Sequence, residues 1–150
     1  MISERGLAGT YFKTMNLPKC TDIRDSAFED CTMHKIVLNS AKNLGSNVFK
    51  NCKNLEMIYA PKVKGFDGCS GCTNLKTVFV PMATGITTDI SSNATIYCSG
   101  RLTSIYFPND FSAYKCTIVS PEYTAGLAIA NSYGEEDRYI HISSDEIARD

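Results

Sequence analysis

The chain repeats one hydrophobic pattern about every twenty residues: an apolar residue, a second apolar residue three positions later, and a proline three positions after that. Complete copies occupy residues 12–18, 55–61, 75–81 and 102–108, a copy at 33–39 ends in Asn39, and a weaker one at 115–121 begins with Lys115. A fixed period of this size is typical of solenoids, in which each repeat buries its apolar side only against neighbouring repeats. The pattern therefore predicts a stack of similar coils.

Each copy is centred on a short segment rich in β-branched and aromatic residues, such as Thr77-Val78-Phe79-Val80, and this composition favours a strand. Side chains alternate along a strand, so the central apolar residue and the residue two positions later share a face. These pairs are expected to face the core: Met15 with Leu17, Ile36 with Leu38, Ile58 with Ala60, Val78 with Val80, and Ile105 with Phe107. The proline that follows cannot donate a ladder hydrogen bond and ends the strand.

The rest of each repeat also keeps its register. A further apolar position recurs five residues after the pattern, at Ile23, Leu44, Phe66 and Ile86. Phe28 and Phe49 follow, and then Cys31 and Cys52; in the third copy Cys69 and Cys72 take these two places. The longest interval between copies, from Leu75 to Leu102, predicts a surface insertion near residues 87–95.

Three segments carry these positions in register: residues 17–31 (LPKCTDIRDSAFEDC), 48–55 (VFKNCKNL) and 71–76 (GCTNLK). They resemble the leucine-rich repeats of BspA-like proteins, and the resemblance extends over residues 10–108. It implies a mainly β fold, a curved right-handed solenoid with a parallel sheet. It also implies use in adhesion or protein binding at surfaces, and it implies no catalytic residues.

The alternation places a second set of side chains on the outer face of the sheet, which solenoids use as a binding surface. One outward column contains Asn16, Val37, Tyr59, Phe79 and Tyr106, and the other contains Thr14, Lys35, Met57, Thr77 and Ser104. Exposed aromatic residues on neighbouring strands tend to mark interaction sites. We therefore predict that a partner contacts Tyr59, Phe79, Tyr106, Met57, Val37 and Lys35. Two structural alternatives are that the aromatic residues only stabilise the sheet, or that the C-terminal segment folds over them.

Composition narrows the functional classes. With 150 residues, 43% apolar and 21% charged, the chain suits one folded domain. The formal net charge of −1 and the lack of a Lys or Arg run predict no nucleic-acid partner. No apolar run is long enough for membrane insertion. The N-terminus lacks the apolar stretch of a signal peptide, so the compartment stays open: intracellular, or secreted or cell-surface as part of a longer exported protein.

Cysteine and histidine are the remaining candidates for chemistry. The chain has seven cysteines, and an odd number disfavours a complete disulfide framework. Cys69-x-x-Cys72 has the spacing of half a zinc or redox motif, but its repeat positions point into the core. Neither His34 nor His141 has a local setting that supports thiol catalysis. We expect no enzymatic activity, no metal and no cofactor.

The sequence predicts different structures at the two ends of the solenoid. An uncapped solenoid end exposes apolar surface and strand edges, so residues 1–10 form a small cap, or the chain is a fragment, or another chain covers this end. Ser120-Pro121-Glu122 has the composition of a helix start and predicts a short capping helix over residues 122–131, followed by a strand over 138–143. The predicted organisation is a solenoid of about five repeats over residues 1–120 and a C-terminal capping segment over 121–150.

These observations favour a non-enzymatic recognition module that binds a protein or cell-surface partner, as in adhesion, through the outer face of the sheet. The alternative is a structural subunit of a larger assembly, such as a virion appendage or a multichain surface fibre. In that case the chain would self-associate through its uncapped N-terminal end.

Overall fold

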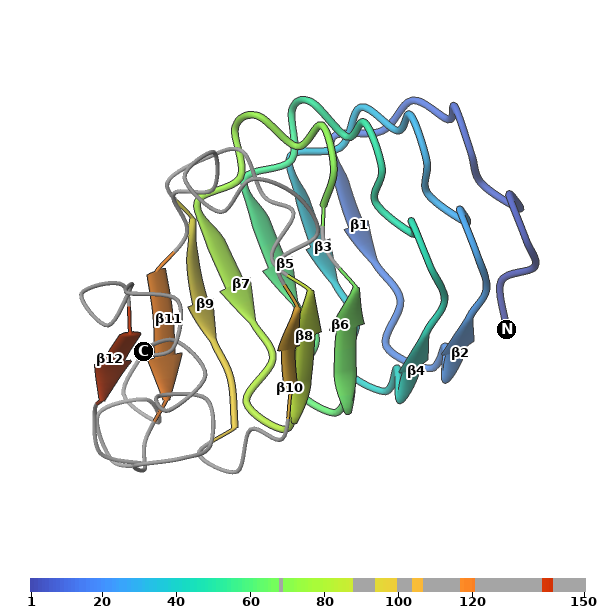
Figure 1. The fold of residues 1–150 in the computed structure, drawn as a ribbon. Coiled ribbons are helices and arrows are strands. Elements are labelled where there is room, and N and C mark those ends of the chain that lie inside the picture. Colours follow the sequence, from blue (N-terminus) through green and yellow to red (C-terminus); the bar gives the residue numbers. More distant parts are fainter. Residues whose placement is uncertain (68, 88–93, 100–103, 107–116, 121–138, 142–150) are drawn as a thin grey trace.

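The computed structural model describes residues 1–67, 69–87, 94–99, 104–106, 117–120 and 139–141. Over these residues the chain winds into stacked coils, and the predicted solenoid is confirmed. Figure 1 shows the stack running from the N-terminal coil on the right to β12 on the left. The described residues form strands and turns and contain no helix, so none of them forms a helix that could cross a membrane.

One long parallel sheet, here called the main sheet, runs along one side of the stack. Its strands in spatial order are β1 (Thr14–Asn16), β3 (Lys35–Val37), β5 (Met57–Tyr59), β7 (Thr77–Phe79), β9 (Thr95–Tyr97), β11 (Thr117–Ser120) and β12 (Tyr139–His141). From β1 to β11 the middle positions are in line, so that Ile36 stands between Met15 and Ile58. Each coil therefore contributes one strand at the same height.

The second side of the stack carries a row of shorter pairings. There β2 (Asp22–Ile23) pairs with β4 (Asn43–Leu44), and β8 (Gly85–Thr87) lies between β6 (Gly65–Asp67) and β10 (Ser104–Tyr106). The apolar column that follows the hydrophobic pattern lies in this row, because Ile23 pairs with Leu44 and Phe66 with Ile86.

The core lies between the two rows of strands. Five of the predicted inward residues from three successive coils, Ile36, Leu38, Ile58, Ala60 and Val78, are fully buried. Phe28 and Phe49 stack inside the turn segments, with ring centroids 6.0 Å apart. The repeat therefore places the same kind of side chain at the same depth in these three coils, as the pattern predicts.

One strand assignment is wrong. We expected Ser104–Tyr106 to continue the main sheet, with Ile105 beside Val78, but β10 pairs with β8 in the second row, where Ile105 meets Ile86. The place beside β7 belongs to β9, in which Ile96 pairs with Val78. Both rows use the same alternation of apolar and polar residues, so the hydrophobic pattern at residues 102–108 fits either one.

The positions of β8 and β9 also shorten the segment that the expected insertion near residues 87–95 can occupy. Thr87 ends β8 and Thr95 begins β9, so Thr95 is part of the main sheet and not of an inserted loop. Residues 88–93 lie outside the described residues, as do Phe107 of the expected inward pair and the whole predicted capping helix. The strand predicted over residues 138–143 is confirmed over Tyr139–His141, which pairs in parallel with β11.

Residues 1–10 follow the path that residues 22–31 take in the next coil. Ile2 forms a parallel bridge with Ile23. The amide groups of this segment donate to carbonyl oxygens one coil further along: Arg5 to Asp25, Leu7 to Ala27, and Gly9 to Glu29. The segment is thus half a coil that stacks in register at the N-terminal end.

Candidate functional site

The outer face of the main sheet carries two columns of side chains, from the first and the third residue of each strand. The third residues stand side by side in the order Asn16, Val37, Tyr59, Phe79 and Tyr97, and the first residues in the order Thr14, Lys35, Met57, Thr77 and Thr95. The middle residues from β3 to β9 are buried. The predicted alternation between core and outer face is therefore confirmed for these strands.

Tyr59, Phe79 and Tyr97 form a continuous line of rings across three strands, which we call the aromatic row. The rings of Tyr59 and Phe79 are nearly parallel, with centroids 5.2 Å apart and an interplanar angle of 2°. Phe79 and Tyr97 are 6.1 Å apart and tilted by 48°. Each ring covers part of its neighbour, and all three are half-buried on the outer face.

The sequence identified two of these three residues. Tyr106 belongs to β10 in the second row, so it does not extend the aromatic row. The place beside Phe79 that was expected for Tyr106 is occupied by Tyr97. Tyr97 was missed because Asn93 and Ser99 stand where the pattern has an apolar residue and a proline. The spacing between copies held the missing signal, since Ile96 follows Val78 at close to the usual interval and Ile105 does not.

The other predicted contact residues surround the aromatic row. Val37 lies directly beside Tyr59, and Met57 lies between Lys35 and Thr77 in the neighbouring column. Val37 and Met57 are half-buried and Lys35 is exposed. The structure thus brings Lys35, Val37, Met57, Tyr59 and Phe79 onto one face, and their contact with a partner stays a prediction.

The cysteines occupy equivalent core positions in successive coils. The amides of Cys31, Cys52 and Cys72 donate to the carbonyls of Phe28, Phe49 and Cys69, so the predicted equivalence of the Cys69–Cys72 pair with Phe49 and Cys52 is confirmed. Both members of the pair are fully buried. Burial raises the pKa of the Cys52 thiol far above its ordinary value, helped by the neighbouring Cys72, and burial raises the pKa of Cys98 to about 12. Such thiols stay protonated and are poor nucleophiles.

The histidines occupy separate places. His34 is exposed and directly precedes β3, whereas His141 lies in β12. Within the described part of the chain, no three side chains of His, Cys, Asp or Glu are grouped closely enough to hold a metal ion.

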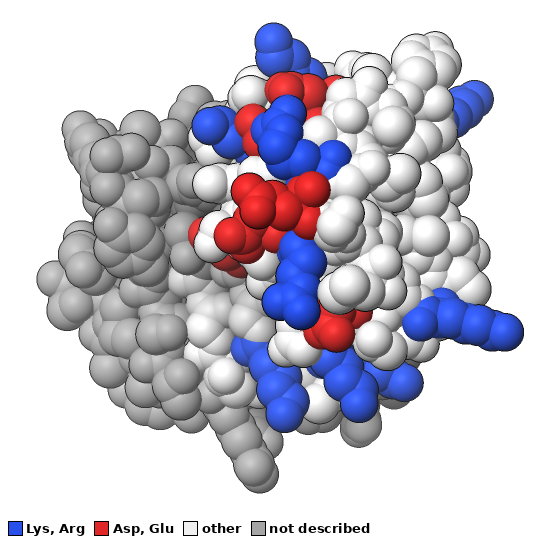
Figure 2. All heavy atoms as spheres, turned by 90° about the vertical axis from the view of Figure 1, so that its right-hand side faces the viewer, with Lys and Arg blue, Asp and Glu red and all other residues white. Residues whose placement is uncertain are grey.

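The N-terminal end of the stack is a second surface of interest. Six apolar residues at this end are only partly buried: Ile2, Leu7, Phe12, Met15, Leu17 and Cys20. Their counterparts in the next coil, Ile23, Phe28, Met33, Ile36, Leu38 and Ala41, are each at most 1% exposed. Figure 2 shows this end, where acidic and basic side chains gather in a band beside a broad uncharged area.

Comparison with protein families gives one match, to the family described as BspA type leucine rich repeat region. It covers residues 1–116 in six copies, including the half-coil formed by residues 1–10. No curated protein and no solved structure matches the chain significantly. Repeats of this family are commonly protein–protein or adhesion modules and are generally non-enzymatic binding scaffolds. The matched region, the period and the in-register coils agree, and the chain belongs to the BspA-type leucine-rich-repeat family.

Proposed function

We propose that the chain is a non-enzymatic recognition module, of the adhesion type, that binds a protein or cell-surface partner through the outer face of the main sheet. The aromatic row carries this proposal. Tyr59 and Phe79 lie parallel at 5.2 Å, and stacking against neighbouring rings fixes their orientation before any partner arrives. Tyrosine is enriched at interfaces because it offers a large contact area with little conformational entropy to lose.

The surroundings of the row support the same function. Lys35 and Thr14 are exposed, and Asn16 is exposed at the end of the column that contains the row. An apolar centre with a polar edge is the usual arrangement of a protein interface, since the centre excludes water and the edge sets the orientation. The parallel sheet holds both parts rigidly.

The proposal can be tested with peptides selected from a random phage-displayed library against the folded chain. We expect most selected peptides to bind at least about tenfold more weakly to a variant with Tyr59→Ser, Phe79→Ser and Tyr97→Ser, since interface aromatic residues commonly dominate binding energy. Met82→Ser removes an apolar side chain that is 50% exposed outside the sheet, and it serves as the matched control.

Both variants should first be compared with the parent by circular dichroism, because loss of the ring contacts also weakens the sheet. Peptides that bind a folded triple variant as tightly as the parent would show that the aromatic row is structural only.

A second candidate is a structural subunit of a larger assembly that joins other chains at its N-terminal end. The six partly exposed apolar residues at that end favour it, because their counterparts in the next coil, which another coil covers, are buried. β1 is also an edge strand of the main sheet, and such an edge can pair with a further strand.

A further inference from the structure

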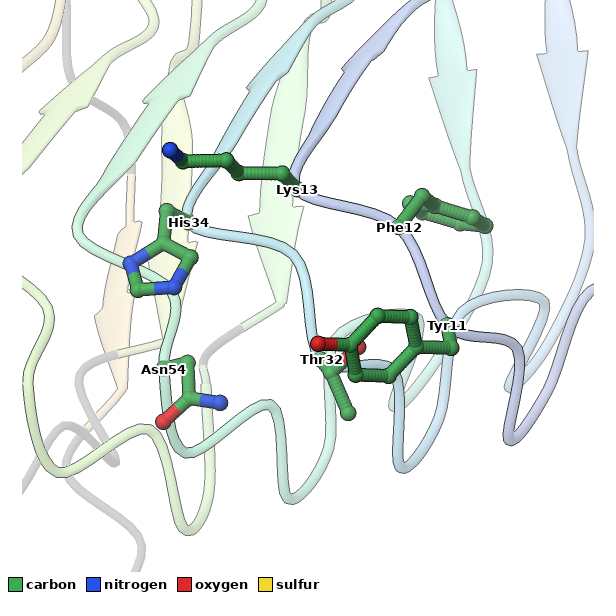
Figure 3. A pocket seen from close by; sticks show the side chains of 6 residues that line it. All are labelled: Tyr11, Phe12, Lys13, Thr32, His34 and Asn54. Atoms are coloured by element: carbon green, nitrogen blue, oxygen red, sulfur yellow. The ribbon is translucent and has the colours of Figure 1, made fainter.

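A polar hollow of about 290 Å³ lies beside the amino-terminal ends of β1 and β3. It is lined by Tyr11, Phe12, Lys13, Thr32, His34 and Asn54. Figure 3 shows Lys13 and His34 pointing to the same side of the ribbon, above Asn54 and the Tyr11 ring. The hollow is separate from the aromatic row and from the buried cysteines.

Stacking of the coils assembles this hollow from residues that are far apart in sequence. Tyr11, Thr32 and Asn54 each directly precede the first apolar residue of a repeat, so they occupy the same position in three successive coils. The amide of His34 donates to the carbonyl of Lys13 at 2.8 Å, which holds these two residues one above the other. The repeat fixes the backbone of the hollow, while its side chains occupy positions that vary between repeats.

The wall of the hollow has more hydrogen-bond donors than acceptors. Lys13 and His34 are exposed, and among the described residues neither side chain has a hydrogen-bond or ion-pair partner. The hydroxyl oxygen of Thr32 is buried and, within the same part of the chain, also lacks a partner. This oxygen has almost no exposed surface, so the polar groups of the wall that are open to a ligand include the exposed side chains of Lys13, His34 and Asn54.

The charge of the hollow is positive. No acidic residue lines it. Glu56, which takes the repeat position of His34 in the next coil, lies 3.7 Å from Lys76 and does not line the hollow. An exposed ammonium group and an exposed amide beside one space are suited to bind an oxygen anion, because charge-assisted hydrogen bonds to an anion are the strongest of this kind.

We propose that the hollow binds a carboxylate group of a protein partner, an acidic side chain or a chain terminus. This inference rests on the proposed function, since it names the chemistry of the partner. The hollow exceeds the size of a single ion and lies near the lower end of ligand pockets, which begin at about 300 Å³. An acidic residue with its own backbone fits such a space.

The position of the hollow favours a protein over a free small acid. Lys13 and His34 directly precede Thr14 and Lys35, the first outward residues of β1 and β3, so the hollow opens beside the outer face. Tyr59 lies one strand and a few residues away from His34, a distance of about 10 Å from standard strand spacings. An extended peptide covers this distance in about three or four residues. A partner that contacts both the hollow and Tyr59 therefore needs an acidic group about three or four residues away from an apolar side chain.

The test uses small probes on the isotope-labelled chain, followed by amide chemical shifts in NMR. N-acetyl-L-glutamate is expected to shift the amides of Thr32, His34 and Asn54 with a Kd on the order of a few millimolar. N-acetyl-L-glutamine amide, which has an amide in place of each carboxylate and is uncharged, is expected not to shift them. Lys13→Met is expected to weaken the binding of N-acetyl-L-glutamate at least about fivefold, and Lys13→Arg to retain it. Lys62→Met, at an exposed lysine beyond the other end of β5, is the matched control and should leave binding unchanged.

Three results would overturn the inference: equal binding of the two N-acetyl probes, an unchanged affinity in a folded Lys13→Met variant, or no shift at these amides. Glucuronate is the third probe, and binding of glucuronate as tight as that of N-acetyl-L-glutamate would assign the hollow to an acidic saccharide instead. None of these probes needs the aromatic row. A failure here is therefore distinguishable from a failure of the proposed function, which the selected peptides test.

Discussion

At the scale of single residues, the cysteines act as buried hydrogen-bond donors. The thiols of Cys31, Cys52 and Cys72 donate to the carbonyls of Leu7, Phe28 and Phe49 in the preceding coil, at 3.1, 3.0 and 3.0 Å. A carbonyl inside a turn needs a partner when it is taken out of water. The Phe28 and Phe49 carbonyls already accept from the amides of Cys31 and Cys52, and the small, weakly polar thiol adds a second donor where the core has little space. This role explains why cysteine recurs at this position without forming disulfides in the described part of the chain.

Replacing Cys52 by Ala should therefore lower the free energy of unfolding by about 2 kcal/mol, since it opens a cavity and removes one of the two hydrogen bonds that the Phe28 carbonyl accepts. Cys20 is the comparison, because it is only partly buried and its thiol lies 3.4 Å from the Asp22 carbonyl. Cys20→Ala should lower that energy by less than about half as much. Urea denaturation of the three proteins measures both values. Equal losses of unfolding free energy at the two positions would mean that the buried thiol hydrogen bond of Cys52 adds no stability.

At the scale of elements, the turn that leads from the second row back to the main sheet has a repeated backbone shape. Two of its positions are left-handed in successive coils, Arg5, Ser26 and Asn47 at one and Gly9, Asp30, Asn51 and Gly71 at the other, with φ between 53° and 80°. Most residues adopt this conformation only with strain. Asp30, Asn47 and Asn51 tolerate this conformation, whereas at Arg5 and Ser26 the stacking of the coils imposes it.

The two left-handed positions predict opposite effects for two substitutions. Gly71→Ala should lower the free energy of unfolding by more than about 1 kcal/mol, because φ is +80° and the added carbon would meet the Asn51 side chain. Ser26→Gly should raise it by a few tenths, about 0.5 kcal/mol, by relieving strain at φ 54°. Gly65→Ala is the control, because its nearest atom is 3.9 Å away and its φ is not left-handed. Thermal unfolding compares all three. A Gly71→Ala variant as stable as the control would contradict the strain argument.

The repeat pattern predicts the position of some strands correctly and of others incorrectly. Apolar residues such as Ile36 and Phe66 were assigned to the correct row because every coil repeats them. Ser104–Tyr106 was assigned to the wrong row because the two rows share one alternation, so the alternation alone does not distinguish them. The hollow beside β1 was not predicted at all. Its side chains, such as Thr32 and His34, occupy positions that vary between repeats, so no periodic signal marks them.

At the scale of the whole molecule, the stack has an apolar surface at its N-terminal end. Leu7 and Phe12 at that end are partly exposed, while their counterparts Phe28 and Met33 are fully buried. A covering coil removes such side chains from water, which stabilises by about 25 cal/mol for each Å² of apolar surface. This surface is suited to contact a second chain.

If the N-terminal end joins two chains, sedimentation velocity should show a concentration-dependent dimer or larger species at about 10–100 µM, as for a weak interface. Leu7→Glu combined with Phe12→Glu should abolish it, because a buried charge without a partner opposes association. Met82→Glu, at an exposed apolar residue outside this end, is the control. A chain that sediments as a monomer throughout this range would exclude self-association through this surface.

The direction of the hydrogen bonds between coils has a mechanical consequence. The amides of Arg5, Ser26 and Phe28 all donate to carbonyls one coil further along, so these bonds run along the axis of the stack. A force that pulls the two ends apart along this axis therefore acts on every layer of bonds, because the layers bear it in series. Each layer can open while the others stay closed, because a coil contacts only its neighbours. Under tension the protein would lengthen coil by coil, like a spring, rather than break in one event.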